Sequence, residues 1–205
     1  MNPIDVPPII DDQGWCSDVP RFACPNCDAR PGDTDINLLV IHNISLPPRE
    51  FGGGHIEALF ANTLDCDCHP YFDQLRGLRV SAHFFIRRDG SLAQFVSTLD
   101  RAWHAGLSEF RGRQRCNDFS IGVELEGSDF DIFCDAQYKS LALLTRALAN
   151  RHPLTDVVGH QHIAPERKTD PGPCFEWGRF REEFSALSSL ALADQKFVPM
   201  LRFPD

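Results

Sequence analysis

A single α/β domain is the fold class that the sequence predicts, and three observations lead to it. The chain has 205 residues, which suits one domain with a substantial core. Two short apolar runs, 38–41 and 157–158, are typical of buried strands. Between them, residues 135–151 carry the spacing of apolar side chains that an amphipathic helix requires. No repeat or interdomain linker interrupts this pattern.

Composition divides the chain into three parts. Residues 1–35 are rich in Pro, Asp and Cys and predict an irregular N-terminal arm. Residues 36–190 contain all the expected strands and helices, and 191–205 form a C-terminal tail. At the start of the domain, the apolar run 38–41 predicts a buried strand that delivers His42 at its C-terminal end.

A loop, a short helix and a hairpin follow this strand. Two prolines and three glycines within 46–54 force a loop. Residues 56–62 then predict a short helix. Residues 82–87 and 91–96 predict the two strands of a hairpin, because an Asp-Gly pair stands between them and suits a tight turn.

The second half of the domain begins with a predicted strand at 120–125, which carries Glu124. The clearest helix is 135–151, with Asp135 as its cap and Pro153 close to its end. Its expected buried face consists of Tyr138, Leu141, Leu144 and Leu148.

The domain closes with one more strand and one more helix. Residues 157–158 predict a short strand that presents His160 at its end. Phe180 and Phe184 are four residues apart and predict a last helix at 176–187. Periodicity alone leaves the order of the strands open.

Composition and charge argue against several function classes. Apolar residues make up 42% of the chain and charged residues 24%, which is ordinary for a globular protein. The net charge of −9 argues against a nucleic acid as partner, and the short basic run at 111–115 suits one anionic group. No apolar stretch approaches the roughly 18 residues that span a bilayer, and the first 14 residues lack the order of a secretory signal. We therefore expect a cytoplasmic protein without a membrane partner.

The eight cysteines leave two interpretations open. The pair Cys24 and Cys27 and the pair Cys66 and Cys68 could together hold one structural zinc through four thiolates. The alternative is free thiols, some of them buried as small apolar groups. The second pair is spaced more tightly than a zinc ribbon requires, which favours free thiols. Without an export signal, disulfides are not expected.

Two histidines at strand ends and one aspartate form a candidate metal site. His42 and His160 each follow an apolar strand, and Asp170 follows His160 in a loop that can fold back. Two imidazoles and a carboxylate are a known ligand set for catalytic zinc, with water in the fourth position. The alternative is that both histidines are ordinary polar residues, since sequence spacing does not show that they meet. His162 is a rival for His160, and the spacing to Asp170 favours His160.

Six segments carry a resemblance to a known family: LLVIHNISLPP at 38–48, SAHF at 81–84, RAWHAG at 101–106, RCNDFSIGVELEG at 115–127, VGH at 158–160 and RKTDPG at 167–172. In this order they resemble the AmpD family, within the zinc amidases related to peptidoglycan-recognition proteins. The resemblance extends from about residue 15 to 187, apart from the regions of Cys24 and Cys66. It implies a mixed central sheet flanked by helices.

The resemblance also implies roles for five residues. Zinc would be bound by His42, His160 and Asp170, while Glu124 and Lys168 would act on the substrate. Amide hydrolysis needs a nucleophile, a base and a positive group near the developing oxyanion. Zinc would activate the water and Glu124 would take its proton and pass it to the leaving nitrogen. Lys168 would help to stabilise the tetrahedral intermediate.

Both catalytic assignments have plain alternatives. Glu126 is a rival for the base, because residues two apart on a strand share a face, so the choice of Glu124 rests on the resemblance. Without the family, Glu124 would be a solvated carboxylate on a strand and Lys168 a surface lysine.

Five further residues are candidate substrate contacts: Asn43, Arg79, Trp103, His104 and Arg115. The indole of Trp103 suits a sugar ring or apolar peptide atoms, with core packing as the alternative, and His104 could donate a hydrogen bond. The two arginines suit carboxylates of a stem peptide, and Asn43 suits its backbone. The other histidines are expected to be structural or on the surface: His55, His69, His83 and His152.

The activity that the resemblance implies is hydrolysis of the amide between the D-lactyl group of muramic acid and L-alanine. Its substrates would be 1,6-anhydromuramyl peptides recycled from the cell wall. One alternative is a muropeptide-binding protein of the same fold without catalysis. Another is a cysteine-zinc module that binds macromolecules. All the candidate ligands and catalytic groups are present, which favours the enzyme.

Overall fold

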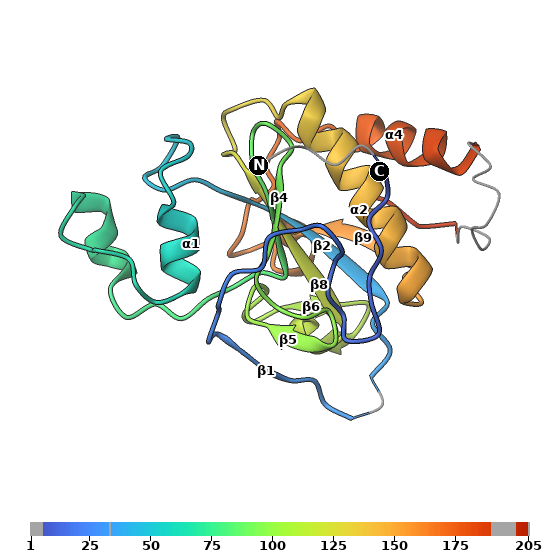
Figure 1. Ribbon diagram of the computed structural model, residues 1–205, viewed down its shortest axis with the longest axis horizontal. Helices are drawn as coiled ribbons and strands as arrows, with labels where there is room; N and C mark the ends of the chain where they lie inside the picture. The colour runs from blue at the N-terminus through green and yellow to red at the C-terminus, as the bar shows by residue number, and fades with distance from the viewer. Residues whose placement is uncertain (1–5, 33, 190–199, 205) are drawn as a thin grey trace.

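The computed structural model describes residues 6–32, 34–189 and 200–204. Within these ranges the chain forms strands and helices around one central sheet, which confirms the predicted α/β class (Figure 1). None of the described helices combines the length and the apolar composition that a membrane crossing requires.

The central sheet has five strands in the order β4-β3-β8-β2-β9. β3 (Phe84–Ile86), β8 (Ser120–Glu126), β2 (Leu38–Ile44) and β9 (Asp156–Gly159) are parallel to one another. β4 (Leu92–Gln94) pairs antiparallel with β3 and completes the predicted hairpin. The sheet is therefore mixed, as the resemblance implied.

Alternation of side chains along β8 separates the core from the functional side of the sheet. Its odd-numbered residues, such as Ile121 and Val123, belong to one buried cluster with side chains of α2 (Asp135–Arg151) and α4 (Trp177–Ser189). These two helices lie side by side over that face (Figure 1). Glu124 and the other even-numbered residues of β8 face the opposite side.

The helix predicted at 135–151 is confirmed, and its expected apolar face is fully buried. Asp135 as its cap is wrong: the cap is Cys134, whose extended backbone precedes the first helical residue. The Cys134 N–H donates to Oε1 of Gln137 at 3.0 Å. Asp135 instead lies in the first turn and accepts a hydrogen bond from Arg179 of α4 at 2.7 Å.

The remaining elements are short. α1 (His55–Phe60) is one residue earlier and shorter than predicted, and it lies on the side of the sheet opposite α2 and α4 (Figure 1). Several elements were not predicted, and they are β1 (Cys27–Ala29), β5 (Asp100–Ala102), β6 (Glu109–Phe110), β7 (Arg113–Gln114), α3 (His160–Ile163) and two 3₁₀ turns, Pro70–Leu75 and Cys116–Asp118.

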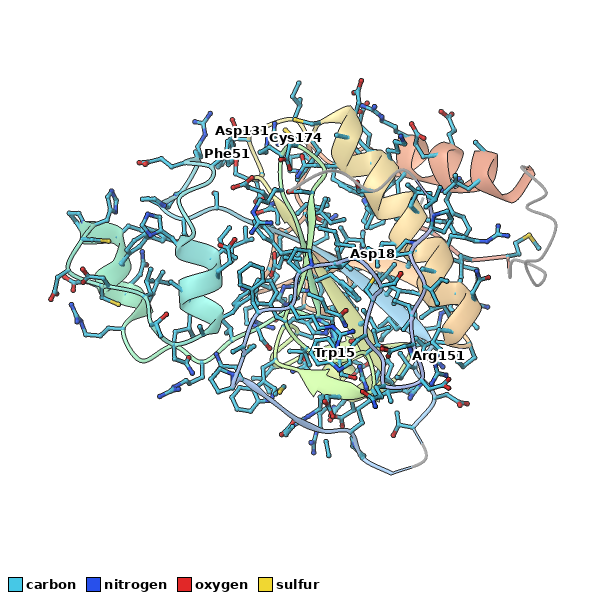
Figure 2. All side chains as sticks on the ribbon, viewed as in Figure 1. Trp15, Asp18, Phe51, Asp131, Arg151 and Cys174 are labelled. Atoms are coloured by element: carbon cyan, nitrogen blue, oxygen red, sulfur yellow. The ribbon has the colours of Figure 1, made fainter. Side chains whose placement is uncertain are left out.

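Both ends of the described chain pack on the domain. The N-terminal arm is largely irregular but contains β1, which pairs antiparallel with β5. Arg151, at the end of α2, donates to the Asp11 carbonyl of the arm. Figure 2 shows Arg151 near the ribbon of the arm. After 191–199, which lie outside the described residues, Arg202 forms an ion pair with Asp156 of β9 at 2.7 Å.

Candidate active site

The side chains of His42, His160 and Asp170 converge at one point. The two Nδ1 atoms of the histidines are 3.0 Å apart, and Oδ2 of Asp170 lies 2.9 Å from Nδ1 of His42 and 3.1 Å from Nδ1 of His160. Among the described residues, this is the one group of three or more His, Cys, Asp or Glu side chains that could hold a metal ion.

The sheet register explains why the two histidines meet. β2 and β9 are parallel neighbours, and Ile41 is paired with Gly159. The next residue of each segment is a histidine, so His42 and His160 emerge beside each other.

The loop that carries Asp170 is held against the end of β9. The Gln161 N–H donates to the Asp170 carbonyl at 2.9 Å. Gly159 allows the close approach, because a Cβ at this position would stand 2.6 Å from Cδ of Pro171. The loop therefore folds back as the sequence suggested, and it brings the carboxylate between the two imidazoles.

The protonation states of the cluster favour a bound cation. Nε2 of His160 lies 3.1 Å from the Ala105 carbonyl, which can only accept, so Nε2 carries the proton and Nδ1 presents a lone pair. Burial lowers the pKa of His42 to about 4, which keeps this imidazole neutral at pH 7. Oδ2 of Asp170 lies within 3.1 Å of the Nδ1 atoms of both histidines. Lone pairs and a carboxylate at such distances repel one another unless a cation lies between them, so the group fits a metal ion.

Glu124 stands beside the metal-binding group. It is the register partner of His42 across the parallel pair of β2 and β8. Its buried Oε2 has no hydrogen-bond partner among the described residues. Burial and the negative charge of Asp170 raise the pKa of Glu124 well above its usual value, against the opposing effect of Lys168.

Glu126, the rival carboxylate, is occupied elsewhere. One of its oxygens accepts a hydrogen bond from the Gly52 N–H, and the other accepts one from the Arg88 N–H at 2.9 Å. The side chain is buried and does not line the cavity at the metal-binding group. The geometry therefore favours Glu124 as the group that reaches a substrate.

A cavity of about 510 Å³ opens over the cluster and is lined by the three candidate ligands together with Glu124 and Lys168. Lys168 comes from the same loop as Asp170, and its charge is close enough to lower the pKa of Glu124. The structure thus brings together all five residues for which the resemblance implied a role in metal binding or catalysis.

Three of the candidate substrate contacts line this cavity, but each is also tied to protein groups. Nε1 of Trp103 donates to Asp28 at 3.2 Å, which fixes the half-buried indole ring. The amide nitrogen of Asn43 donates to Asp129 at 2.8 Å and to the Pro171 carbonyl at 3.0 Å. His104 is buried, and both of its ring nitrogens lie within hydrogen-bond distance of protein atoms.

The two arginines lie outside the cavity. Arg79 lies in an adjoining hollow that shares Leu59, Leu75 and Leu78 with the cavity. Arg115 lines a different hollow, and its Nε forms an ion pair with Asp118 at 3.2 Å. Their contacts with substrate carboxylates stay predictions.

The rival histidine and the cysteines have other surroundings. Nδ1 of His162 accepts a hydrogen bond from the Gly159 N–H at 2.8 Å, so this ring turns away from the cluster. The eight cysteines are free thiols, and the sulfurs of Cys24, Cys27, Cys66 and Cys68 do not form a group that could hold a metal. Nothing in the described part of the chain therefore supports the cysteine-zinc module.

The lining residues that were not predicted include Ser128, Asp129 and Phe130. They follow directly after β8, the strand that carries Glu124. A position just beyond the C-terminal end of a parallel strand is a common place for ligand contacts, and this was the signal that could have indicated them.

Comparison with known proteins agrees with this geometry. Residues 32–173 match the model of a family described as N-acetylmuramoyl-L-alanine amidase. The chain belongs to this family. The resemblance to AmpD noted in the sequence is confirmed by relatives named 1,6-anhydro-N-acetylmuramyl-L-alanine amidase AmpD. The one from Citrobacter freundii is 56% identical over 83% of this chain and 92% of its own length. The one from Escherichia coli K12 is 55% identical over 83% and 94%.

Solved structures of amidases share the fold. A crystal structure of a selenomethionine derivative of AmpD has a TM-score of 0.80 and 55% identity, covering 84% of this chain and 97% of its own. The amidase AmiD of E. coli, solved with anhydro-N-acetylmuramic acid-L-Ala-D-γ-Glu-L-Lys, has a TM-score of 0.54 and 30% identity, over 85% of this chain and 65% of its own.

Proposed function

We propose that this amidase uses zinc to hydrolyse the amide between the D-lactyl group and L-alanine of 1,6-anhydromuramyl peptides. The observation that carries the proposal is the placement of Glu124, whose Oε2 has no hydrogen-bond partner among the described residues, beside the His42, His160 and Asp170 group in one open cavity. The relatives named AmpD supply the substrate class.

Zinc is the metal that best suits the donor set. Two imidazoles and one carboxylate leave a fourth tetrahedral position open for water, as catalytic zinc sites do. Ligand atoms about 2.0 to 2.1 Å from a tetrahedral zinc are ~3.3 Å from one another. The contacts of 2.9, 3.0 and 3.1 Å in the cluster are close to that spacing.

The bound metal would supply a water of lowered pKa and a positive charge next to the scissile carbonyl. Glu124 takes the proton of the attacking water and returns it to the leaving nitrogen, since an amide leaves as an amine only when protonated. Its surroundings suit both steps, because burial and Asp170 favour the protonated carboxyl while Lys168 favours the ionised form.

Lys168 acts on the charge that develops on the carbonyl oxygen. Lys168 lines the cavity and lies on the same loop as Asp170. A fixed positive charge near the oxyanion stabilises the transition state more than the neutral substrate. Lys168 therefore accelerates the chemical step more than it strengthens binding.

The anhydro sugar is the form that the site should prefer. Its ring lacks the free reducing hydroxyl and is less polar there, so it suits contact with the indole of Trp103. A reducing sugar would bury an extra hydroxyl at that position, and an unpaired hydroxyl costs about 1 to 3 kcal/mol. Such soluble fragments would be met in the cytoplasm, and cytoplasmic localisation stays part of this proposal.

Incubation of the purified protein with anhydromuramyl-tripeptide, followed by mass spectrometry, tests the proposal. The expected products are the anhydromuramic sugar acid and the free tripeptide, whose masses together exceed that of the substrate by one water. Chelation should stop the reaction, and added zinc should restore it. Substrate that binds but stays intact would identify a muropeptide-binding protein instead.

A further inference from the structure

His104 connects a metal-binding histidine to the backbone through a chain of hydrogen bonds. Nδ1 of His104 lies 2.9 Å from Nε2 of His42, and its Nε2 lies 3.1 Å from Oγ of Ser120. The Ser120 hydroxyl in turn lies 2.6 Å from the Cys116 carbonyl.

The carbonyl at the end sets the direction of every bond in this chain. A carbonyl only accepts, so the Ser120 hydroxyl donates its hydrogen to Cys116. The oxygen of Ser120 must then accept from Nε2–H of His104, which leaves Nδ1 of His104 unprotonated. That nitrogen accepts from Nε2–H of His42, so Nδ1 of His42 presents its lone pair toward His160 and Asp170.

Ala105, the residue after His104, fixes the tautomer of His160. The Ala105 carbonyl accepts from Nε2–H of His160 at 3.1 Å. One side chain anchors both residues, because Oδ1 of Asn117 accepts from the N–H of His104 at 3.1 Å and from that of Ala105 at 2.8 Å. Two consecutive residues thus fix the lone pairs of both histidines.

The His104 ring packs closely against β8 at Gly122. Only glycine leaves room for it, because a Cβ at this position would stand 2.5 Å from the ring. The ring is buried, and both of its nitrogens are used within the protein. It therefore has no free donor to offer a substrate, although it borders the cavity.

We propose that His104 is a positioning residue rather than a substrate contact: together with Ser120 it holds His42 in the tautomer that binds the metal. The inference rests on the proposed function only in taking the His42, His160 and Asp170 group as a zinc site. A partner of this kind orients the ligand and raises its basicity, and its loss typically weakens metal affinity 10- to 100-fold.

The test compares His104→Leu with His104→Asn by competition for zinc against a chromophoric chelator, without substrate. Leucine removes both ring nitrogens, and zinc affinity should fall about 10- to 100-fold. Asparagine places an amide oxygen close to the position of Nδ1, so it should recover most of the affinity. Ser120→Ala, a smaller change, should weaken binding in the same direction. If His104→Leu had unchanged zinc affinity and a raised KM, the proposal would be overturned and His104 would be assigned to substrate binding.

A second measurement is independent of the metal and of catalysis. In ¹⁵N-labelled, metal-free protein, imidazole correlation spectra should show His42 protonated at Nε2 in the wild type. In His104→Leu the population protonated at Nδ1 should grow, while His104→Asn should keep the wild-type pattern. If the His42 tautomer is the same in His104→Leu as in the wild type, the chain of hydrogen bonds through His104 does not set it. That result would contradict this proposal even if the protein hydrolyses the expected amide.

Discussion

Glu124 and His42 stand side by side as register partners on the parallel strands β8 and β2. On its other side, His42 has His160, because the register of β2 with β9 pairs the residues just before them. The sheet itself therefore sets the spacing of His42, His160 and Glu124. Sites on regular elements hold their geometry more closely than sites on loops.

The first prediction concerns His160. Replacement by Ala should remove both zinc and activity, because two remaining ligands bind zinc poorly. Metal content by atomic absorption and turnover on anhydromuramyl-tripeptide would be measured on one preparation. His162→Ala is the matched control, since that ring faces away from the cluster and should leave zinc bound. Full zinc content in His160→Ala would rule out the site.

The second prediction concerns the approach of the Asp170 loop to β9. Gly159→Ala would place a Cβ 2.6 Å from Cδ of Pro171, so the loop must move and carry Asp170 with it. We expect weaker zinc binding in a folded protein, measured by chelator competition. Gly178→Ala is the control, because nothing lies within 4 Å of a Cβ there. Equal zinc affinities in Gly159→Ala and Gly178→Ala would show that zinc binding does not depend on the position of the Asp170 loop.

The third prediction concerns Lys168. Lys168→Met removes the ammonium group but keeps an unbranched side chain, so zinc should stay bound. Loss of one group that stabilises an oxyanion typically lowers kcat by about 100- to 1,000-fold. Steady-state kinetics would check this, with KM changing little. A variant that raised KM and kept kcat would assign Lys168 to substrate binding.

The fourth prediction concerns the sugar. Preference in kcat/KM for the anhydro form over the reducing form should be about tenfold to a hundredfold, from the cost of one unpaired hydroxyl. Trp103→Ala should narrow that ratio. Asp28→Ala would test whether the hydrogen bond to Nε1 of Trp103 orients the ring, and it should narrow the ratio less. Equal rates on both sugars would point to a general wall amidase.

Local patterns in the sequence indicated most of the elements but not how they meet. The helix at 135–151 and the hairpin of β3 and β4 were predicted because their signals lie within short windows. The pairing of β2 with both β8 and β9 joins segments far apart in the chain, and no local pattern encodes it. The meeting of His42 and His160 therefore had to be inferred from the resemblance.

Two details of the site depend on atoms that sequence patterns do not reveal. Alternation placed Glu124 and Glu126 on one face, and the backbone N–H groups of Gly52 and Arg88 distinguish them by occupying Glu126. His104 was expected to donate a hydrogen bond to the substrate, but the only N–H of its neutral ring is directed at Ser120, a neighbour that the sequence pattern does not reveal.

The most direct test of the account is the metal content and the turnover of Glu124→Ala, measured on the same sample. Glu126→Gln serves as the control, because it alters a carboxylate on the same strand that is committed to backbone groups. Glu124→Ala should keep one zinc per chain and lose turnover by about a hundredfold or more, the usual scale for a general base. The account assigns metal binding to His42 and proton transfer to Glu124. A Glu124→Ala protein that lost its zinc, or that kept near-normal turnover, would contradict this assignment.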